Sequence, residues 1–172
     1  DVGKQARKAK AQIGFVPDHY ALYEQLTGRE YINYIADIYD VPQKERDERI
    51  EKMVGLFELE GSFDCSMKTY SHGMKQKIAL IAALAHDPKV LIMDEPFVGL
   101  DPKAVYDMKE IMRDMAKDGK TIFFSTHILD VAEKLCDRVA IIKDGTIVKV
   151  GKMKDIKGDE SLEQVFLELG EK

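Results

Sequence analysis

Apolar residues recur at helical spacing through one long stretch of the chain, from about residue 27 to residue 87. Thr27-Gly28-Arg29-Glu30 has the spacing of a capping box, which predicts that a first helix starts there. This helix would carry Tyr31, Ile35 and Ile38 on one face. The stretch is therefore predicted to be a mainly helical block.

Two further helices are expected in the same block. One follows Pro42, which suits the first turn of a helix, and Gly61 would end it. Its apolar positions at helical spacing are Ile50, Met53, Val54 and Phe57. The other follows Ser71 and continues to Asp87-Pro88.

The rest of the chain alternates short apolar runs with helical patterns. Strands are predicted at 13–17, 90–93, 121–125, 139–142 and 147–150, and helices at 101–119, 128–136 and 161–169. Asp144-Gly145 fits a two-residue hairpin turn between the last two strands. The run at 90–93 is expected to be buried on both faces, and 121–125 to be another buried strand. This alternation predicts an α/β fold with a mostly parallel sheet.

Composition narrows the class of protein. The 172 residues are enough for one domain with a real core, and 45% are hydrophobic and 33% charged. A net charge of −5 gives no basic footprint, so no nucleic-acid partner is predicted. No apolar run approaches the roughly 20 residues of a membrane-spanning helix, and the polar first residues are no secretion signal. Cys65 and Cys136 form no Cys-x-x-Cys pair and are expected to be free thiols in a reducing cytosol.

Two adjacent carboxylates follow the predicted strand at 90–93. Open α/β sheets bind ligands just beyond the carboxyl ends of their strands, where Asp94 and Glu95 stand. Asp94 is a candidate ligand for a divalent metal, and Glu95 could polarise an attacking water. A strand that has simply reached water is the alternative for this segment taken alone.

Three other groups of residues could belong to the same chemistry. Ser71 and Gly73 open an apolar helix, where backbone N–H groups favour an anion, although a simple N-cap explains them too. Gly99-Leu100-Asp101-Pro102 reads as a turn and a helix cap. His127 follows the strand at 121–125, so it is expected on the same sheet edge as the acids, where it could donate to a phosphate. Alone, such a histidine is more often incidental.

The order of these segments resembles that of the ATP-binding cassette (ABC) ATPase family. YSHGMKQK, residues 70–77, is similar to the family's signature sequence, and VLIMDEP, residues 90–96, to its Walker B strand. GLDP and STH resemble its D-loop and H-loop. The resemblance implies a P-loop NTPase fold in which 27–87 is an inserted helical subdomain. Residues 1–26 and 88–172 would be the remainder of the RecA-like core.

The resemblance also implies roles for individual residues. Asp94 would support Mg²⁺, Glu95 would be the general base, and His127 would contact the γ-phosphate of ATP. Ser71 and Gly73 would contact the γ-phosphate of an ATP held on a second ATPase subunit.

Two loop residues complete this set. Asp101 would lie at the interface of the two subunits, and Asp18 stands where the family has its Q-loop glutamine.

Some features depart from the family pattern. His72 and Met74 replace the second glycine and the glutamine of the signature, spellings similar to those of ABC-2 exporters. No G-x-x-x-x-G-K-[ST] sequence occurs, so the chain looks like the carboxyl-terminal part of the domain, without its P-loop portion. The chain alone is therefore expected to bind ATP very weakly and not to hydrolyse it. An uncovered apolar sheet surface, with self-association or rearranged packing, is also expected.

The resulting interpretation is the energy-coupling subunit of an ABC transporter, an exporter, located in the cytoplasm on the inner face of the membrane. Transmembrane permease subunits would be its partners, with Tyr20, Leu22 and Tyr23 as candidate contact residues unless they pack in the core. A soluble ABC ATPase of translation or DNA repair is an alternative. A non-catalytic regulatory module is another, although the presence of Glu95 and His127 counts against it.

Overall fold

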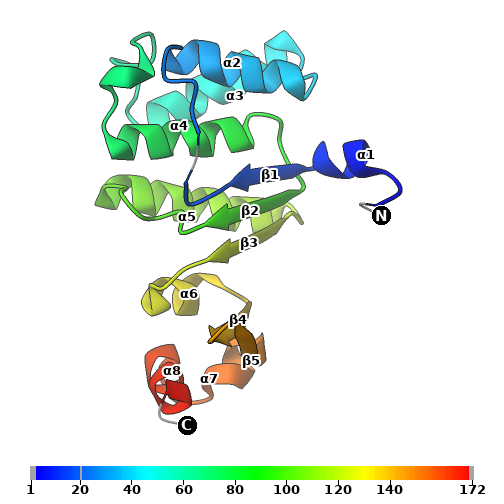
Figure 1. Cartoon of the computed structure of the whole chain (residues 1–172), viewed down its shortest axis with the longest axis vertical. Coiled ribbons are helices and arrows are strands. Elements are labelled where there is room, and N and C mark those ends of the chain that lie inside the picture. The colour runs from blue at the N-terminus through cyan, green and yellow to red at the C-terminus, as the bar shows by residue number, and fades with distance from the viewer. Residues whose placement is uncertain (1–2, 20, 171–172) are drawn as a thin grey trace. The chain divides into compact units, whose positions relative to one another are not determined.

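A computed structural model of the chain describes residues 3–19 and 21–170, which fall into two compact units, Asp1–Ser125 and Thr126–Lys172. In the first unit the elements are α1 (Ala6–Lys10), β1 (Ile13–Val16), α2 (Gly28–Ile38), α3 (Gln43–Leu56), the short 3-10 helix η1 (Met67–Thr69), α4 (His72–Leu84), β2 (Val90–Asp94), α5 (Pro102–Lys117) and β3 (Thr121–Ser125). In the second they are α6 (Leu129–Leu135), β4 (Arg138–Lys143), β5 (Thr146–Lys152), α7 (Met153–Lys157) and α8 (Leu162–Gly170). Figure 1 labels the α-helices and strands along the chain.

The first unit is built on a three-stranded parallel sheet with the order β1-β2-β3. In its register Val16 pairs with Met93, and Met93 with Phe124. All three strands run the same way, so their carboxyl ends meet at one edge (Figure 1). The predicted parallel sheet is thus confirmed.

The two faces of this sheet are buried to different extents. On the first face Val16, Leu91 and Met93 are buried, and α4 and α5 pack against β1 and β3. On the second face Phe15 and Phe123 are 60% and 65% exposed. Val90 and Ile92 of the central strand are only partly buried. The prediction that 90–93 is buried on both faces is therefore wrong, and so is that of a buried strand at 121–125, whereas the expected uncovered apolar surface is present among the described residues.

Helix α2 begins at the predicted capping box, in which Thr27 and Glu30 bind each other's backbone N–H groups. Its buried face differs from the predicted one, because Ile32 and Ala36 are fully buried and Ile38 is exposed. Gly28 sets this rotation: an added β-carbon there would lie 2.7 Å from the hydroxyl of Tyr70. The positions one and two turns further on therefore face α4 as well.

Helix α3 ends earlier than the sequence suggested. Its last residue is Leu56, not a residue next to Gly61, because Glu58 adopts the left-handed conformation with a φ of 56°. The apolar face was predicted correctly, since Ile50, Met53 and Val54 are buried. Helix α4 starts at the predicted cap and is buried along most of its length, with α2 and α3 packed on it.

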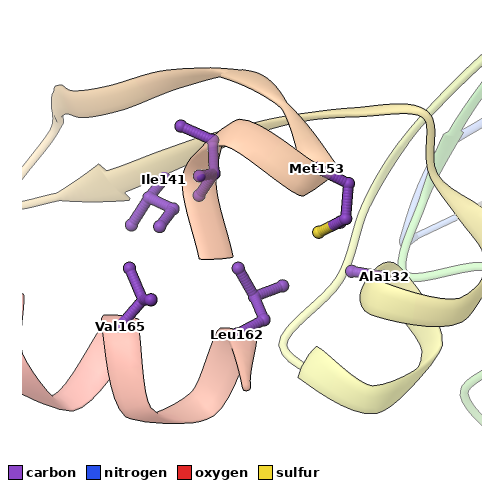
Figure 2. Close-up of a cluster of buried hydrophobic side chains, with 6 residues drawn as sticks. Ala132, Ile141, Met153, Leu162 and Val165 are labelled. Carbon is purple, nitrogen blue, oxygen red and sulfur yellow. The ribbon is translucent and has the colours of Figure 1, made fainter. Parts of the chain in front are cut away.

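The second unit has its own core, shown in Figure 2. The hairpin of β4 and β5 is antiparallel, and Asp144 and Gly145 both have positive φ at its tip, as the predicted turn requires. The six residues of the core come from α6, the hairpin, α7 and α8, and are Ala132, Ile141, Met153, Ile156, Leu162 and Val165.

The short helices α1 and α7 were not predicted from the sequence. The division into 27–87 and the remainder stays a prediction; the compact units divide the chain after Ser125 instead. Within residues 3–19 and 21–170, no helix combines the length and apolar character needed to cross a lipid bilayer.

Candidate functional site

The carboxyl edge of the sheet brings Asp94 and Glu95 together with Ser125. Asp94 is the last residue of the central strand and pairs in register with Ser125, the last residue of β3. The Ser125 hydroxyl donates to Oδ1 of Asp94 and accepts a hydrogen bond of 3.3 Å from the Glu95 backbone N–H. One serine therefore contacts both members of the acid pair.

Glu95 has an unusual backbone conformation. Its φ is 45°, in the left-handed region that costs a residue with a side chain about 1–3 kcal/mol. The turn is closed by the Val98 N–H, which donates to the Glu95 carbonyl at 3.2 Å. Strain of this kind persists where the surroundings hold it, and it concentrates at functional sites.

Asp18 lies two residues beyond the end of β1, at the same sheet edge as the acids. Its carboxylate is half exposed and lies 2.9 Å from Nδ1 of His19. The topology thus places the predicted Q-loop position beside the carboxyl end of the central strand.

The start of α4 lies against the loop that follows the acids. Ser71 is the N-cap, and its hydroxyl accepts from the Met74 N–H at 3.2 Å. An added β-carbon on Gly73 would lie 2.6 Å from the carbonyl oxygen of Gly99, so no side chain fits between the two backbones. The structure therefore brings the predicted signature and D-loop segments into contact within one chain.

Asp101 has two partners. It caps α5 by accepting from the Ala104 N–H at 2.9 Å, and its other oxygen lies 2.7 Å from Nζ of Lys77 on α4. The Lys77 ammonium, followed by the Ala104 N–H, lowers the pKa of the Asp101 carboxyl. The carboxylate is thereby held ionised at the start of α5.

His127 belongs to the second unit, two residues beyond β3, and its side chain is exposed. The neighbouring Thr126 hydroxyl accepts from the Ile128 N–H at 3.1 Å and shapes the turn into α6. Convergence of His127 with the acid pair stays a prediction.

Comparison with known proteins identifies the family. The sequence profile of the family described as "ABC transporter" matches residues 1–98, more than half of the 172. The chain belongs to this family. A solved structure described as the ATP binding subunit of an ABC transporter superposes with a TM-score of 0.92 at 32% identity, covering 98% of this chain and 72% of that one. The fold is therefore the ABC ATPase type of P-loop NTPase.

Named ABC relatives include proteins of different roles. The linearmycin resistance ATP-binding protein LnrL of Bacillus subtilis is 35% identical over 90% of this chain and 50% of its own length. The methionine import ATP-binding protein MetN of Geobacillus kaustophilus is 37% identical over 88% of this chain and 44% of its own. The chain thus spans about half the length of the curated relatives it matches.

The Asp94 carboxylate has the chemistry of a Mg²⁺ ligand. Mg²⁺ in nucleotide sites is usually held by one or two carboxylates together with waters and phosphates. Asp94 offers an exposed carboxylate at the strand end, oriented by the Ser125 hydroxyl. Within the described part of the chain, no three His, Cys, Asp or Glu side chains are grouped to hold a metal on their own.

Three residues that contact the ABC site segments stood within the quoted motifs but were given no role of their own: Ser125, Gln76 and Lys77. Ser125 ends a predicted strand beside the acids, so its position in the register was a usable signal. Gln76 is only 4% exposed on α4, and such a buried amide needs a partner. Lys77 pairs across a sequence separation that no local pattern indicates.

Proposed function

We propose that this chain is part of an ATP-binding and ATP-hydrolysing subunit of an ABC transporter, which couples hydrolysis to transport across a membrane. The observation that carries this proposal is the acid pair at the carboxyl end of the central strand, with both acids contacting Ser125. Phosphoryl transfer needs a metal-bearing carboxylate and a base that orients water. Asp94 would hold the Mg²⁺ of the nucleotide, and Glu95 would take the proton of the attacking water.

Three of the remaining site residues would bind the phosphates, and two would lie beside the site. His127 would donate to the γ-phosphate, and Asp18 would occupy the Q-loop position near the metal. Ser71 and Gly73 would contact the γ-phosphate of ATP on a second ATPase subunit, because the start of α4 presents backbone N–H groups to an anion. Asp101 would lie at this subunit interface.

The grip on the phosphates would come largely from outside these 172 residues. They contain no G-x-x-x-x-G-K-[ST] sequence, whose backbone amides and lysine bind the β- and γ-phosphates in P-loop proteins. The chain by itself would therefore bind Mg-ATP very weakly and release no phosphate. Isothermal titration of the 172-residue chain tests this point, and micromolar affinity would refute it.

Membrane permease subunits would dock near the segment between β1 and α2. Tyr23 is 55% exposed there, and its ring meets that of Tyr34 edge-on, with the centroids 5.6 Å apart. Burial in the core thus does not account for Tyr23, whereas Leu22 is half-buried and Tyr20 lies outside the described residues. Lys75 of α4 lies 2.7 Å from Glu24, which would link this segment to the signature helix.

The direction of transport would be export, and the subunit would sit on the cytoplasmic side of the membrane. The signature spelling with His72 and Met74 supports export. The relatives do not decide the direction, since one is named for linearmycin resistance and another for methionine import. Transport assays in inside-out vesicles, where an exporter accumulates its substrate, would separate the two directions.

Replacement of the proposed base tests the enzyme function. In the full-length protein with its membrane subunits, Glu95→Gln should abolish turnover and leave ATP binding intact, because the amide keeps the shape but cannot take a proton. Glu163→Gln on the exposed side of α8 is the matched control and should hydrolyse ATP normally. Turnover in Glu95→Gln comparable to the control would show that the base is another residue.

A further inference from the structure

One face of α4 contacts the segment Pro96–Asp101 at three points. Gly73 meets the backbone of Gly99, and Lys77 pairs with Asp101. Between them, Nε2 of Gln76 donates to the carbonyl of Pro96 at 3.3 Å. Residues three and four apart lie on the same side of a helix, so these contacts form one continuous surface.

Gln76 is the central and most buried of these contacts. Its side chain is 4% exposed, and a buried amide without a hydrogen bond is costly. Its acceptor belongs to the residue directly after Glu95. The position of this amide therefore bears on the backbone one residue beyond the proposed base.

The other side of the Glu95 backbone is held by β3. The Glu95 N–H donates to Oγ of Ser125 and to its carbonyl oxygen, each at 3.3 Å. The left-handed φ of 45° at Glu95 thus lies between one partner from α4 and one from β3. A strained conformation with a partner on each side is what a rigid catalytic turn requires.

We propose that Gln76 and Ser125 are positioning residues for Glu95, which together hold its strained backbone and so fix the direction of its carboxylate. The inference rests on the proposed ATPase function. It also makes the base sensitive to the helix that carries the signature, because a shift of α4 would move Gln76 and with it the Pro96 carbonyl. Neither side chain would touch the nucleotide.

Hydrogen exchange tests, independently of catalysis, whether Gln76 and Ser125 hold the backbone of Glu95. In the full-length protein, Gln76→Met keeps the shape of the side chain but removes the donor, and Ser125→Ala removes the hydroxyl. Both should speed exchange of the Glu95 and Val98 amides about tenfold or more, since these amides close the strained turn. The matched control is Gln43→Met on the exposed first turn of α3, which should leave both amides unchanged.

Kinetics test the positioning role. Each variant should lower kcat by about 10- to 100-fold, as expected for a misplaced catalytic group, with the KM for ATP changed less than about twofold. Ser125→Thr should restore most of kcat because it restores the hydroxyl. A loss of general stability would instead affect Ser125→Thr and Ser125→Ala alike.

The outcomes separate the two hypotheses. Unchanged exchange at Glu95 and Val98 in both variants would show that Gln76 and Ser125 do not hold the backbone of Glu95, whatever the activity. Faster exchange with an unchanged kcat would refute the positioning role while the ATPase proposal stands. A wild-type protein that binds ATP but releases no phosphate would refute the proposed hydrolysis and, with it, the positioning role.

Discussion

The two faces of the three-stranded sheet carry similar apolar residues but meet different surroundings. Gly14, Val16, Leu91 and Met93 are on the face packed by helices, and Gly14 lies so close to α4 that an added β-carbon would be 2.5 Å from the Ala83 carbonyl oxygen. Phe15, Ile92 and Phe123 pair in register across the other face, where the two phenylalanines are exposed. We call these the packed face and the open face.

The open face leads to the site. Side chains alternate along a strand, so Asp94 and Ser125 share the side of Ile92 and Phe123. The carboxylate proposed to hold the metal is thus on the open face, at the end of the central strand. The difference between the faces teaches that the site and the uncovered apolar surface are one region of the sheet.

The largest expected effect contrasts two neighbouring phenylalanines of β3. Phe124 lies on the packed face with its ring edge-on to Phe97 at 5.8 Å, whereas Phe123 is on the open face. Phe124→Ala should lower the free energy of unfolding by about 2–4 kcal/mol, because it leaves a cavity against the helices. Phe123→Ala should change it by less than about 0.5 kcal/mol.

Urea unfolding of the 172-residue chain, monitored by circular dichroism, measures the free energy of unfolding of both variants. The two curves are fitted with the same dependence of this free energy on urea concentration. Equal losses for the two phenylalanines would mean that the faces do not differ in solution and that the open row is covered.

Sequence patterns predicted this sheet well but not its burial. The strand positions, the parallel pairing and the caps at Thr27, Ser71 and Asp101 follow from local chemistry. An unbroken apolar run at 90–93 indicates a buried strand, yet it cannot say what covers each face. The buried face of α2 was missed because the fit of Gly28 under Tyr70, a contact distant in sequence, sets the rotation of the helix.

The sequence predicted the residues of the site better than the contacts between them. Asp94, Glu95, Ser71 and Asp101 were identified from motifs, and the structure places the acids at the sheet edge and Ser71 and Asp101 at helix starts. The register of β2 and β3 could have indicated the contact of Ser125 with the acids. The contact of Gln76 depends on the tertiary packing of α4 against the segment after β2, which no spacing in the sequence indicates.

A smaller effect is expected on self-association through the open face. Replacing Phe15 and Phe123 together with Ser should weaken any dimer of the 172-residue chain about tenfold, which corresponds to about 1.4 kcal/mol. This is less than the roughly 1.5–3 kcal/mol for full burial of each phenylalanine side chain, because a contact between two open faces would bury each ring only in part. Sedimentation equilibrium measures the dissociation constant. Tyr106→Ser on α5 is the control, because that ring is equally exposed, at 62%, but lies away from the sheet row.

If the dissociation constant were unchanged by the double substitution but raised by Tyr106→Ser, the self-association surface would be on α5. The open face would then contribute no more to self-association than the rest of the surface.

The smallest effect concerns a polar link on the packed face. His86, just after α4, stacks on Tyr39 with ring centroids 3.7 Å apart, and its Nε2 donates to the Ile13 carbonyl of β1 at 3.1 Å. Its buried Nδ1 has no hydrogen-bond partner among the described residues, so a proton there would find no acceptor. Burial, and then the nearby charge of Arg49, lower the pKa of His86, while the Ile13 carbonyl and Asp87 oppose this change.

Acid should therefore destabilise the folded chain through His86. In the unfolded chain the imidazole takes up its proton near the ordinary pKa of about 6.5, and in the folded chain only at lower pH. Between these values the unfolded state binds more protons, so the free energy of unfolding falls as the pH drops below about 6.5. The melting temperature measured from pH 7.5 to 5.0 should show this fall, and His86→Phe, which keeps the stacked ring but cannot titrate, should flatten it. His19→Gln, in the exposed loop after β1, should keep the wild-type slope; if it flattened the curve as well, the acid sensitivity would not come from the link between α4 and the packed face.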